Sequence, residues 1–217
     1  MEIIRYAELK AHPWRNGGGV TRELARHPAA ASPQDNPGAA GWDWRVSIAD
    51  VSKAGDFSAF PGMDRVLTVL EGELLLLSVD GAEHPLEKYR PFRFSGDAAA
   101  AGALPTGDVR DLNVITRRGV FKGYTSIIEL SKKRAHPVFE GQLGILLQGQ
   151  AAVAPGTAGA EPGAPSGGET SEGSPGTVSE EPTTLGRYDA VVGSDTGTPE
   201  ILGRGFLAVV SIDPAAD

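Results

Sequence analysis

Val69-Leu70-Glu71-Gly72-Glu73-Leu74 is the stretch on which the fold prediction rests, because Leu146-Leu147-Gln148-Gly149-Gln150-Ala151 repeats its pattern in the second half of the chain. Two further pairs of segments match in the same order: Tyr89 to Asp97 with Tyr188 to Asp195, and Val109 to Ile115 with Gly205 to Ser211. Repeats with a period well above about 50 residues indicate duplicated domains, since solenoid repeats are shorter. We therefore expect two similar units in one chain.

Short β-type runs separated by Gly, Pro and Asp turns make up much of the sequence. The expected strands span residues 42–51, 65–79, 89–94, 109–116, 124–130, 142–152, 188–192 and 206–212. Segments with helical periodicity are almost absent. This pattern is typical of an all-β sandwich or barrel, so the repeat predicts two barrels, the first in residues 1–120 and the second in residues 121–217.

A run of three glycines interrupts the segment Pro13-Trp14-Arg15-Asn16-Gly17-Gly18-Gly19-Val20-Thr21-Arg22-Glu23. Consecutive glycines are entropically costly unless a tight bend, a bulge or a bound group needs the exposed backbone amides. A phosphate-binding P-loop is excluded, because the run lacks the Gly-Lys-Ser/Thr ending and β-type residues follow it. We expect a glycine bulge that opens a strand, with Trp14 and Asn16 at its mouth. An ordinary flexible loop is the alternative.

Two segments alternate between apolar and polar residues. In the first, one side carries Trp42, Trp44, Val46 and Ile48, and the other carries Asp43, Arg45, Ser47 and Ala49. In the second, Asp111, Asn113 and Ile115 oppose Leu112, Val114 and Thr116. One interpretation is that the two polar faces meet inside the first barrel, around a cavity lined by Arg45, Ser47, Asp111 and Asn113. The alternative is that they face water, as most half-buried antiparallel strands do.

The glycine segment resembles the HutD/Ves family when it is combined with Trp44-Arg45-Val46-Ser47-Ile48-Ala49-Asp50 and Phe57-Ser58-Ala59-Phe60-Pro61-Gly62-Met63-Asp64-Arg65. The likeness runs from about Arg5 to Leu130 and more faintly through the second half. It implies a bicupin, with two cupin-like β-barrels in one chain. It also implies a link to bacterial histidine degradation and a small-ligand pocket without established catalysis or metal. Since Arg45 and Ser47 stand inside the Trp-Arg-Val-Ser-Ile-Ala motif, the resemblance favours the barrel interior for them.

Residues 151–182 consist mostly of Gly, Pro, Ala, Ser, Thr and Glu. Such a segment buries too little apolar surface to offset the entropy of ordering, so we expect a long disordered insertion in the second barrel. Because the cost of closing a loop grows only logarithmically with its length, the fold tolerates an insertion of this size. Residues 27–41, rich in Ala, Pro and Gly, are expected to connect the two strands of a hairpin.

The amino-acid composition excludes several classes of function. The chain has no cysteine among its 217 residues, which excludes disulfides, thiol nucleophiles and Cys-based metal sites. Its net charge is −8, and five acidic residues lie in residues 151–182, so −8 minus −5 leaves −3 for the rest. This balance argues against nucleic acid or a membrane surface as a partner. No apolar run reaches the about 18 residues of a membrane span and the start lacks a signal-peptide layout, so we expect a cytoplasmic protein.

No metal and no cofactor are expected. A metal-binding cupin needs three or four convergent ligands, whereas the four histidines are scattered and each precedes a proline: His12, His27, His84 and His136. A site built from Asp, Glu and one His is the alternative. No Ser-His-Asp order or nucleophile elbow is present, so we expect binding rather than catalysis.

The predicted function is the binding of a small anionic metabolite derived from histidine, such as formylglutamate or urocanate, to modulate the degradation pathway. Arg65 is expected at the rim, where its guanidinium pairs with a ligand carboxylate or with Asp64 or Glu71. Phe57, Phe60 and Pro61 are expected to form an apolar wall. The candidate ligand-binding residues are Trp14, Asn16, Gly17, Gly18, Gly19, Thr21, Arg45, Ser47, Arg65, Asp111 and Asn113.

Two other functions stay open. One is a metal-independent isomerase or hydrolase of a small polar metabolite, with proton transfer by Asp50, Asp111 or a tyrosine. The other is a stress-response or interaction protein in which the cavity of the first barrel is vestigial. The second barrel is expected to be structural, because its candidate strands are apolar throughout. Burial against the first barrel or against another subunit explains this composition, which leaves a homodimer as a candidate assembly.

Overall fold

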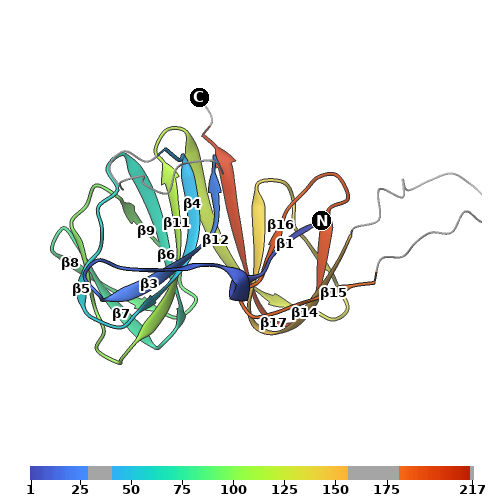
Figure 1. Cartoon of the computed structure of the whole chain (residues 1–217), viewed down its shortest axis with the longest axis horizontal. Coiled ribbons are helices and arrows are strands. Elements are labelled where there is room, and N and C mark those ends of the chain that lie inside the picture. Colours follow the sequence, from blue (N-terminus) through green and yellow to red (C-terminus); the bar gives the residue numbers. More distant parts are fainter. Residues whose placement is uncertain (29–40, 156–180, 216–217) are drawn as a thin grey trace, which may run out of the picture.

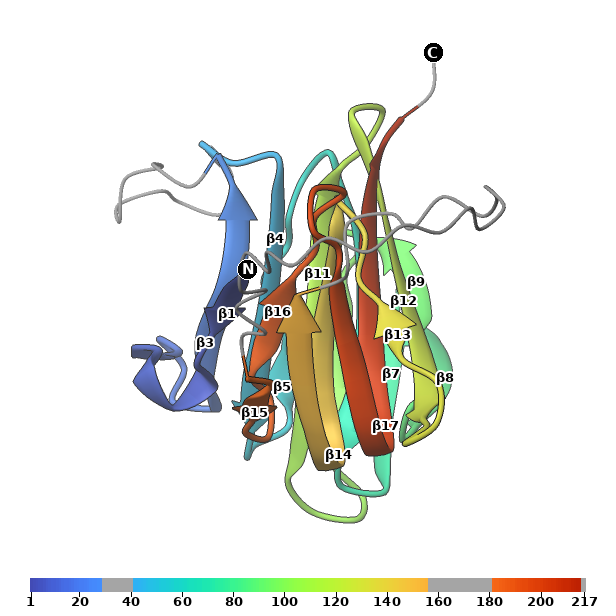
Figure 2. The same cartoon turned by 90° about the vertical axis from the view of Figure 1, so that its right-hand side faces the viewer.

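The computed structural model describes residues 1–28, 41–155 and 181–215. Over these ranges the chain is almost entirely β-structure, and its one helical element is a short 3₁₀ turn, η1 (Tyr6–Glu8). Figure 1 shows two β lobes side by side, and Figure 2 shows the second lobe in front of the first. The all-β prediction with two barrel-like units is confirmed.

The first lobe consists of two antiparallel sheets. The six-stranded sheet has the order β2 (Ala11–Pro13), β3 (Gly19–His27), β4 (Trp44–Val51), β11 (Val109–Arg117), β6 (Met63–Glu71) and β9 (Phe92–Ser95). The four-stranded sheet has the order β5 (Gly55–Asp56), β10 (Ala100–Ala103), β7 (Leu74–Val79) and β8 (Ala82–Glu87). An apolar cluster with members from both sheets, among them Leu67 and Val69 of β6 and Leu75 and Leu77 of β7, packs them together.

The second lobe is one seven-stranded sheet. Its order is β1 (Glu2–Ile4), β16 (Ala190–Val192), β14 (Gln142–Pro155), β17 (Pro199–Pro214) and β12 (Phe121–Leu130), with β13 (His136–Pro137) beside β17 and β15 (Thr183–Leu185) beside β14. The first strand of the chain therefore pairs with β16 in the second lobe. Residues 2–4 contribute to this lobe, although the predicted first unit includes them.

The internal repeat of the sequence reappears as a repeat of strand register. Val69 of β6 pairs with Asp111 of β11, and Leu146 of β14 pairs with Leu207 of β17. In each lobe the residue after this pair is left out of the ladder by a β-bulge. The match between the two closing runs of the sequence is thereby confirmed residue for residue.

Two tyrosines complete the repeat. The backbone N–H groups of Tyr89 and Tyr188 donate to the carbonyl oxygens of Val69 and Leu146, at 2.8 and 2.6 Å. Both tyrosines have a left-handed backbone, with φ of 65° and 68°, so they form turns. The predicted strands at residues 89–94 and 188–192 accordingly begin later, as β9 and β16.

The single long strand predicted over residues 65–79 is wrong. β6 ends at Glu71 and β7 begins at Leu74 in the other sheet. Gly72 makes this change of sheet possible, because its φ is 87° and a Cβ there would lie 2.7 Å from the carbonyl oxygen of Asp108. The apolar sequence of residues 65–79 gives no sign of this turn, which depends on the glycine at position 72.

The two predicted connections are partly described. The hairpin over residues 27–41 is confirmed by the pairing of β3 with β4, and residues 29–40 lie outside the described residues. The disordered insertion was predicted over residues 151–182. Residues 151–155 instead complete β14, where they pair with β17, and residues 156–180 lie outside the described residues.

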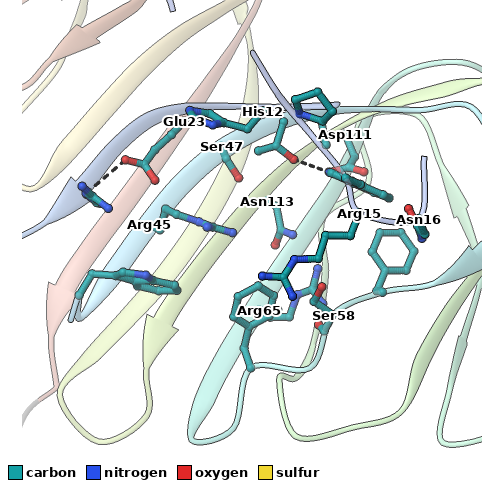
Figure 3. Close-up of a pocket in the computed structure, with 18 of the residues that line it drawn as sticks. His12, Arg15, Asn16, Glu23, Arg45, Ser47, Ser58, Arg65, Asp111 and Asn113 are labelled. Atoms are coloured by element: carbon teal, nitrogen blue, oxygen red, sulfur yellow. Dashed lines mark hydrogen bonds and ion pairs between the residues drawn. The ribbon is translucent and has the colours of Figure 1, made fainter. Parts of the chain in front are cut away.

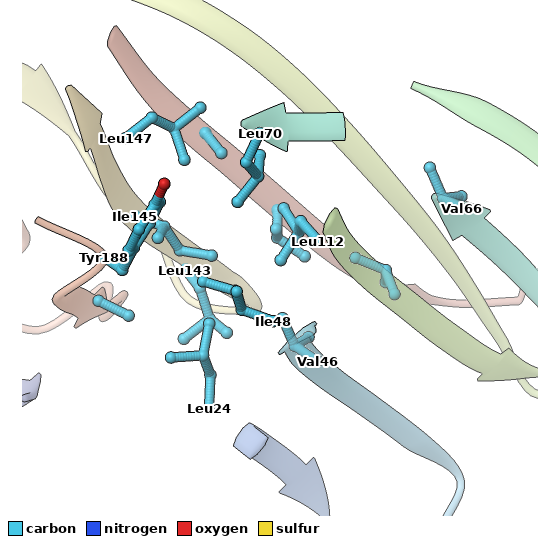
Figure 4. Packing of buried hydrophobic residues seen from close by; sticks show 14 of the residues in the cluster. Leu24, Val46, Ile48, Val66, Leu70, Leu112, Leu143, Ile145, Leu147 and Tyr188 are labelled. Atoms are coloured by element: carbon cyan, nitrogen blue, oxygen red, sulfur yellow. The ribbon is translucent and has the colours of Figure 1, made fainter. Parts of the chain in front are cut away.

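The lobes share one apolar core. Val46, Ile48 and Leu112 of the six-stranded sheet pack against side chains of β14 that include Leu143 and Ile145, and all five are at most 5% exposed (Figure 4). Each buried aliphatic side chain contributes about 1.5–3 kcal/mol. The second lobe thus covers one face of the six-stranded sheet, as its apolar strands predicted. The opposite face of that sheet is left to line the interior of the first lobe.

Candidate functional site

A cavity of about 790 Å³, called the cup below, lies in the first lobe, over the inner face of the six-stranded sheet (Figure 3). The sheet forms its floor, and β2, the β2–β3 loop and the segment after β5 form its walls. Eight of the predicted ligand-binding residues line it: Trp14, Asn16, Thr21, Arg45, Ser47, Arg65, Asp111 and Asn113. Their role as ligand contacts stays a prediction, but the structure brings them together.

Strand register explains this convergence. Neighbouring strands place side chains in three rows on the inner face of the sheet. The rows are Arg26, Arg45, Ile115 and Arg65, then Glu23, Ser47, Asn113 and Leu67, then Thr21, Ala49, Asp111 and Val69. Because residues two apart on a strand point to the same face, the predicted alternation carries all three rows to one side. One end of the cup therefore collects three arginines, and Asp111 stands at the other end.

Arg65 lies deep in this cup rather than at its rim. It is 2% exposed, and its guanidinium carbon lies 4.8 Å from the ring centre of Phe94 and 5.2 Å from that of Phe60. Nη1 donates to the carbonyl oxygen of Ser58 at 3.2 Å, whereas Nε has no hydrogen-bond partner among the described residues. Burial lowers the pKa of Arg65 to about 10, although the charge of Asp111 opposes that change.

The predicted pairing of Arg65 with Asp64 or Glu71 is not seen. Asp64 instead accepts from Arg118 at 2.9 Å, and Glu71 accepts from Arg110 at 2.8 Å. Asp64 and Glu71 therefore form their ion pairs outside the cup. The charge of Arg65 is not neutralised by either of them and faces the cavity.

Arg45 faces the cavity from β4. Its guanidinium carbon lies 5.1 Å from the ring centre of Trp42 and 5.5 Å from that of Phe60, and its buried Nε lacks a hydrogen-bond partner within the described chain. Burial lowers its pKa, while Glu23 opposes this effect. Trp42 was predicted on the opposite side with Trp44. It lies on the cavity side because β4 begins only at Trp44 and the alternation does not extend to residue 42.

Asp111 is the most unusual group in the cup. It is 1% exposed, and neither carboxylate oxygen has a hydrogen-bond partner in the described part of the chain. Burial raises its pKa to about 7; the charge of Arg65 opposes the rise and that of Asp50 adds to it. Oδ1 of Asn113, two residues along β11, is also buried without a partner. Unpaired buried polar atoms are costly and rare, so a cavity that holds several of them is suited to a polar ligand.

The β2–β3 loop explains the glycine run without a ligand. Gly17 has a φ of 65°, and its N–H donates to the carbonyl oxygen of Trp14 at 3.0 Å. The N–H of Gly18 donates to Oδ1 of Asn16 at 2.9 Å. Two of the three glycine amides are thus used inside the loop, and none of the three glycines lines the cavity. The expectation that Gly17 and Gly18 offer their amides to a ligand is therefore wrong.

Gly19 is the glycine that needs a close approach. A Cβ at this position would lie 2.5 Å from the carbonyl oxygen of Asp50 and 3.1 Å from the indole of Trp14. That indole donates from Nε1 to Oγ1 of Thr21 at 2.8 Å, so the contact fixes Trp14 at the edge of the cup.

Replacing Gly19 by alanine is expected to destabilise the protein by about 1 to 3 kcal/mol, because the added methyl group overpacks this contact. Urea unfolding followed by circular dichroism measures the change. Gly55→Ala is the matched control, since its Cβ meets only the amide nitrogen of Asn16 at 3.9 Å. Equal stability of the two variants would show that the Gly19 contact is not tight.

The cavity carries an excess of positive charge. Its five cationic lining residues are Lys10, Arg15, Arg26, Arg45 and Arg65, and its three acidic ones are Glu23, Asp56 and Asp111. Glu23 already pairs with Arg26 at 3.3 Å. In a chain of net charge −8, a cluster with two surplus positive charges attracts small anions.

Several lining residues were missed from the sequence. Lys10 and His12 belong to β2 and its approach, Arg15 to the loop, and Asp56 and Ser58 to the segment around β5. None of them belongs to the two alternating segments that supplied the other candidates. Phe57 and Phe60, predicted as an apolar wall, do line the cavity, whereas Pro61 does not.

The corresponding region of the second lobe is filled. The repeat places Leu207 and Val209 where the first lobe has Asp111 and Asn113, and both belong to the apolar cluster of that lobe. At Gly144, a Cβ would lie 2.9 Å from Ile201 and 3.0 Å from Val138. Aliphatic packing thus replaces the polar cup, in agreement with a structural role for this lobe.

Within the described residues, no group of three or more His, Asp or Glu side chains is arranged to hold a metal ion. No helix in the same residues is long and apolar enough to cross a membrane.

Comparisons with known proteins agree on one family. The family model of HutD matches residues 6–208. Protein Ves from Citrobacter koseri is 39% identical over 120 residues, which cover 54% of this chain and 59% of that protein. The structure of HutD from Pseudomonas fluorescens SBW25, in a formate condition, is 25% identical with a TM-score of 0.70, and 99% of each chain is covered.

The fold is also shared more widely. A cupin 2 conserved barrel protein from Leptotrichia buccalis is 8% identical, with a TM-score of 0.53 over 97% of this chain and 95% of that one. This likeness shows a cupin-like fold alone. The matched stretch spans less than two thirds of the length of the curated relatives it resembles, 59% and 57% for the first two.

Proposed function

This chain belongs to the HutD family, and on that premise we propose that its first lobe binds a small anionic metabolite of histidine degradation, such as formylglutamate or urocanate, and thereby modulates that pathway. The observation that carries the proposal is a pair of arginines that line the cavity, the buried Arg65 and the half-buried Arg45. The Nε atom of each is buried and has no hydrogen-bond partner among the described residues. Buried charges without partners are strongly disfavoured, so a bound anion would complete them.

The size and chemistry of the cavity support a small ligand. A volume of about 790 Å³ lies within the range of small-molecule sites, about 300–1,000 Å³. Arg45 and Arg65 stand on either side of Ile115 in one row, so their guanidinium groups approach a carboxylate from two strands. Planar guanidinium groups bind carboxylates with paired hydrogen bonds, which favours carboxylic acids over neutral molecules.

The remaining residues have supporting roles in this proposal. Trp14 and Asn16 shape the mouth, and Phe57 and Phe60 form the apolar wall against which the carbon skeleton of the ligand packs. Asn113, at the centre of the floor, offers an amide to an uncharged polar group. The cytoplasmic location and the homodimer stay predictions.

Titration of the wild-type protein with N-formyl-L-glutamate and with urocanate tests the proposal. We expect measurable heat and a change in tryptophan fluorescence, because Trp14 and Trp42 both line the cavity. Binding should weaken as salt concentration rises, since the attraction is electrostatic. Glutaramide, a smaller neutral molecule with amides in place of the two carboxylates, serves as the control compound.

Two results would contradict the proposal. Absence of heat and of any fluorescence change with both acids at low salt would rule out these metabolites as ligands. Equal affinity for glutaramide would show that the arginines do not select for anions.

A second candidate function is favoured by Asp111. A buried carboxyl group with a pKa of about 7, in the same cavity as Arg45 and Arg65, is suited to general acid–base catalysis on a bound acid. A metal-independent isomerase or hydrolase would consume its ligand during the titration. Product analysis after incubation separates this function from simple binding.

A further inference from the structure

Two buried carboxyl groups of the described residues behave differently. Asp189, 5% exposed, accepts hydrogen bonds from Arg5 at 2.6 Å, from the N–H of Tyr6 at 3.0 Å and from the N–H of Gly186 at 2.9 Å. Asp111, 1% exposed, accepts none within the described chain and lines the cavity instead. The Asp189 carboxylate is stabilised by hydrogen bonds within the protein. The Asp111 carboxylate lacks such bonds among the described residues and is available to a ligand in the cup.

The charges around Asp111 come from every wall of the cup. Arg65 on β6 opposes its protonation, and Asp50 on β4 favours it. The other titratable or charged residues that line the cavity are Arg45 on β4, Glu23 and Arg26 on β3, Lys10 and His12 near β2, Arg15 in the loop and Asp56 on β5. Neither oxygen of the Asp111 carboxylate has a hydrogen-bond partner among the described residues, so the charge of Arg65 acts on it without a direct contact.

A bound anion would shift the protonation equilibrium of Asp111 toward the neutral form. It places a second negative charge in the same cavity as Asp111, and it neutralises the arginine charge that favours the ionised form of Asp111. Both effects favour the neutral carboxyl group. A neutral carboxyl group in such a site donates a hydrogen bond, which an ionised one does not.

From this geometry we infer that Asp111 is protonated in the complex and donates a hydrogen bond to an oxygen acceptor of the ligand, so that each bound anion is accompanied by one proton. The inference rests on the proposed function and specifies its ligand class. The ligand carries a carboxylate for the arginine row and, at the other end, an oxygen acceptor such as a carbonyl group or a second carboxylate. A ligand with an ammonium group at that end is disfavoured.

The expected pH dependence follows from proton linkage. The free cup has a pKa of about 7 at Asp111, and the complex has a higher one. Below about pH 7 the group is protonated in both states, and the affinity is constant. Above it, binding requires proton uptake, so the dissociation constant rises by up to tenfold for each pH unit.

Calorimetric titration with N-formyl-L-glutamate between pH 6 and pH 9 tests the inference, in two buffers of different ionisation enthalpy. We expect proton uptake approaching one per ligand at pH 8. Asp111→Asn, which keeps a hydrogen-bond donor, should bind without this pH dependence and more tightly than the wild type at pH 8.5. Asp108→Asn, the same change at an exposed residue outside the cavity, should retain the wild-type slope.

Further outcomes decide between the two proposals. Wild-type binding that is independent of pH, or a pH dependence that survives in Asp111→Asn, overturns the inference and leaves the proposed function standing. L-Glutamate, with an ammonium group in place of the formamide, should bind more weakly, and tighter binding with proton release also overturns it. No binding at any pH overturns both. The wild-type heats in two buffers do not depend on the folding of any variant.

Discussion

Replacing Arg45 by alanine is expected to weaken the binding of N-formyl-L-glutamate by about 2 to 5 kcal/mol, roughly 30- to 5,000-fold. Arg45 lies against the rings of Trp42 and Phe60, and its Nε has no partner in the described residues. Its removal therefore deletes a preorganised charge and leaves a bound carboxylate half paired. Isothermal titration calorimetry at low salt measures the loss.

Two companion variants make this result specific. Arg45→Lys retains the charge but not the planar fork, so it should recover only part of the affinity. Arg134→Ala removes an exposed arginine that does not line the cavity, and it should bind like the wild type. An Arg45→Ala protein with wild-type affinity would place the anion elsewhere.

Replacing Asp111 by asparagine is expected to stabilise the folded protein at pH 8 by about 2 to 4 kcal/mol. Its pKa is about 7 in the folded state and 3.8 for an ordinary aspartate, which corresponds to about 4 kcal/mol. An unpaired asparagine amide offsets part of that gain. Urea unfolding of the ligand-free protein at several pH values measures the difference.

The sign of the pH dependence follows from proton counting. Between about pH 4 and pH 7 the folded wild type keeps the Asp111 proton, whereas the unfolded chain has released it, so this group lowers stability as pH rises. The advantage of Asp111→Asn should therefore be near zero at pH 4, grow up to pH 7 and stay constant above it. A destabilised variant at pH 8 would mean that the carboxylate is ionised and well paired.

Much of the fold follows from local pattern. The repeat between residues 69–74 and 146–151 predicted duplicated units, and matching bulges and tyrosine turns confirm it. The alternation in residues 44–49 separated the two faces of β4, and the resemblance to the HutD/Ves family predicted that Arg45 and Ser47 face inward. A strand with one polar and one apolar face needs two different environments, and the second lobe and the cup supply them.

Other parts required three-dimensional contacts that no local pattern shows. An apolar run over residues 65–79 contains the turn at Gly72, and the depth of Arg65 depends on the aromatic rings that close over it. Lys10 and Arg15 reach the cup because β2 folds beside β3, a pairing without an alternating signature. The glycine run suggested a ligand, yet the close neighbours of Gly19 are the chain's own Asp50 and Trp14.

The aliphatic filling of the second lobe has a consequence for how the molecule can change. A hollow with unpaired charged groups lowers the stability of the lobe that contains it, and folded proteins have a margin of only about 5–15 kcal/mol. Here the second lobe is packed with aliphatic side chains such as Leu207 and Val209. It stabilises the first lobe through the core that the two lobes share. Substitutions on the cavity floor of the first lobe therefore cost the protein less of its stability than the same changes would in a lobe without such a neighbour.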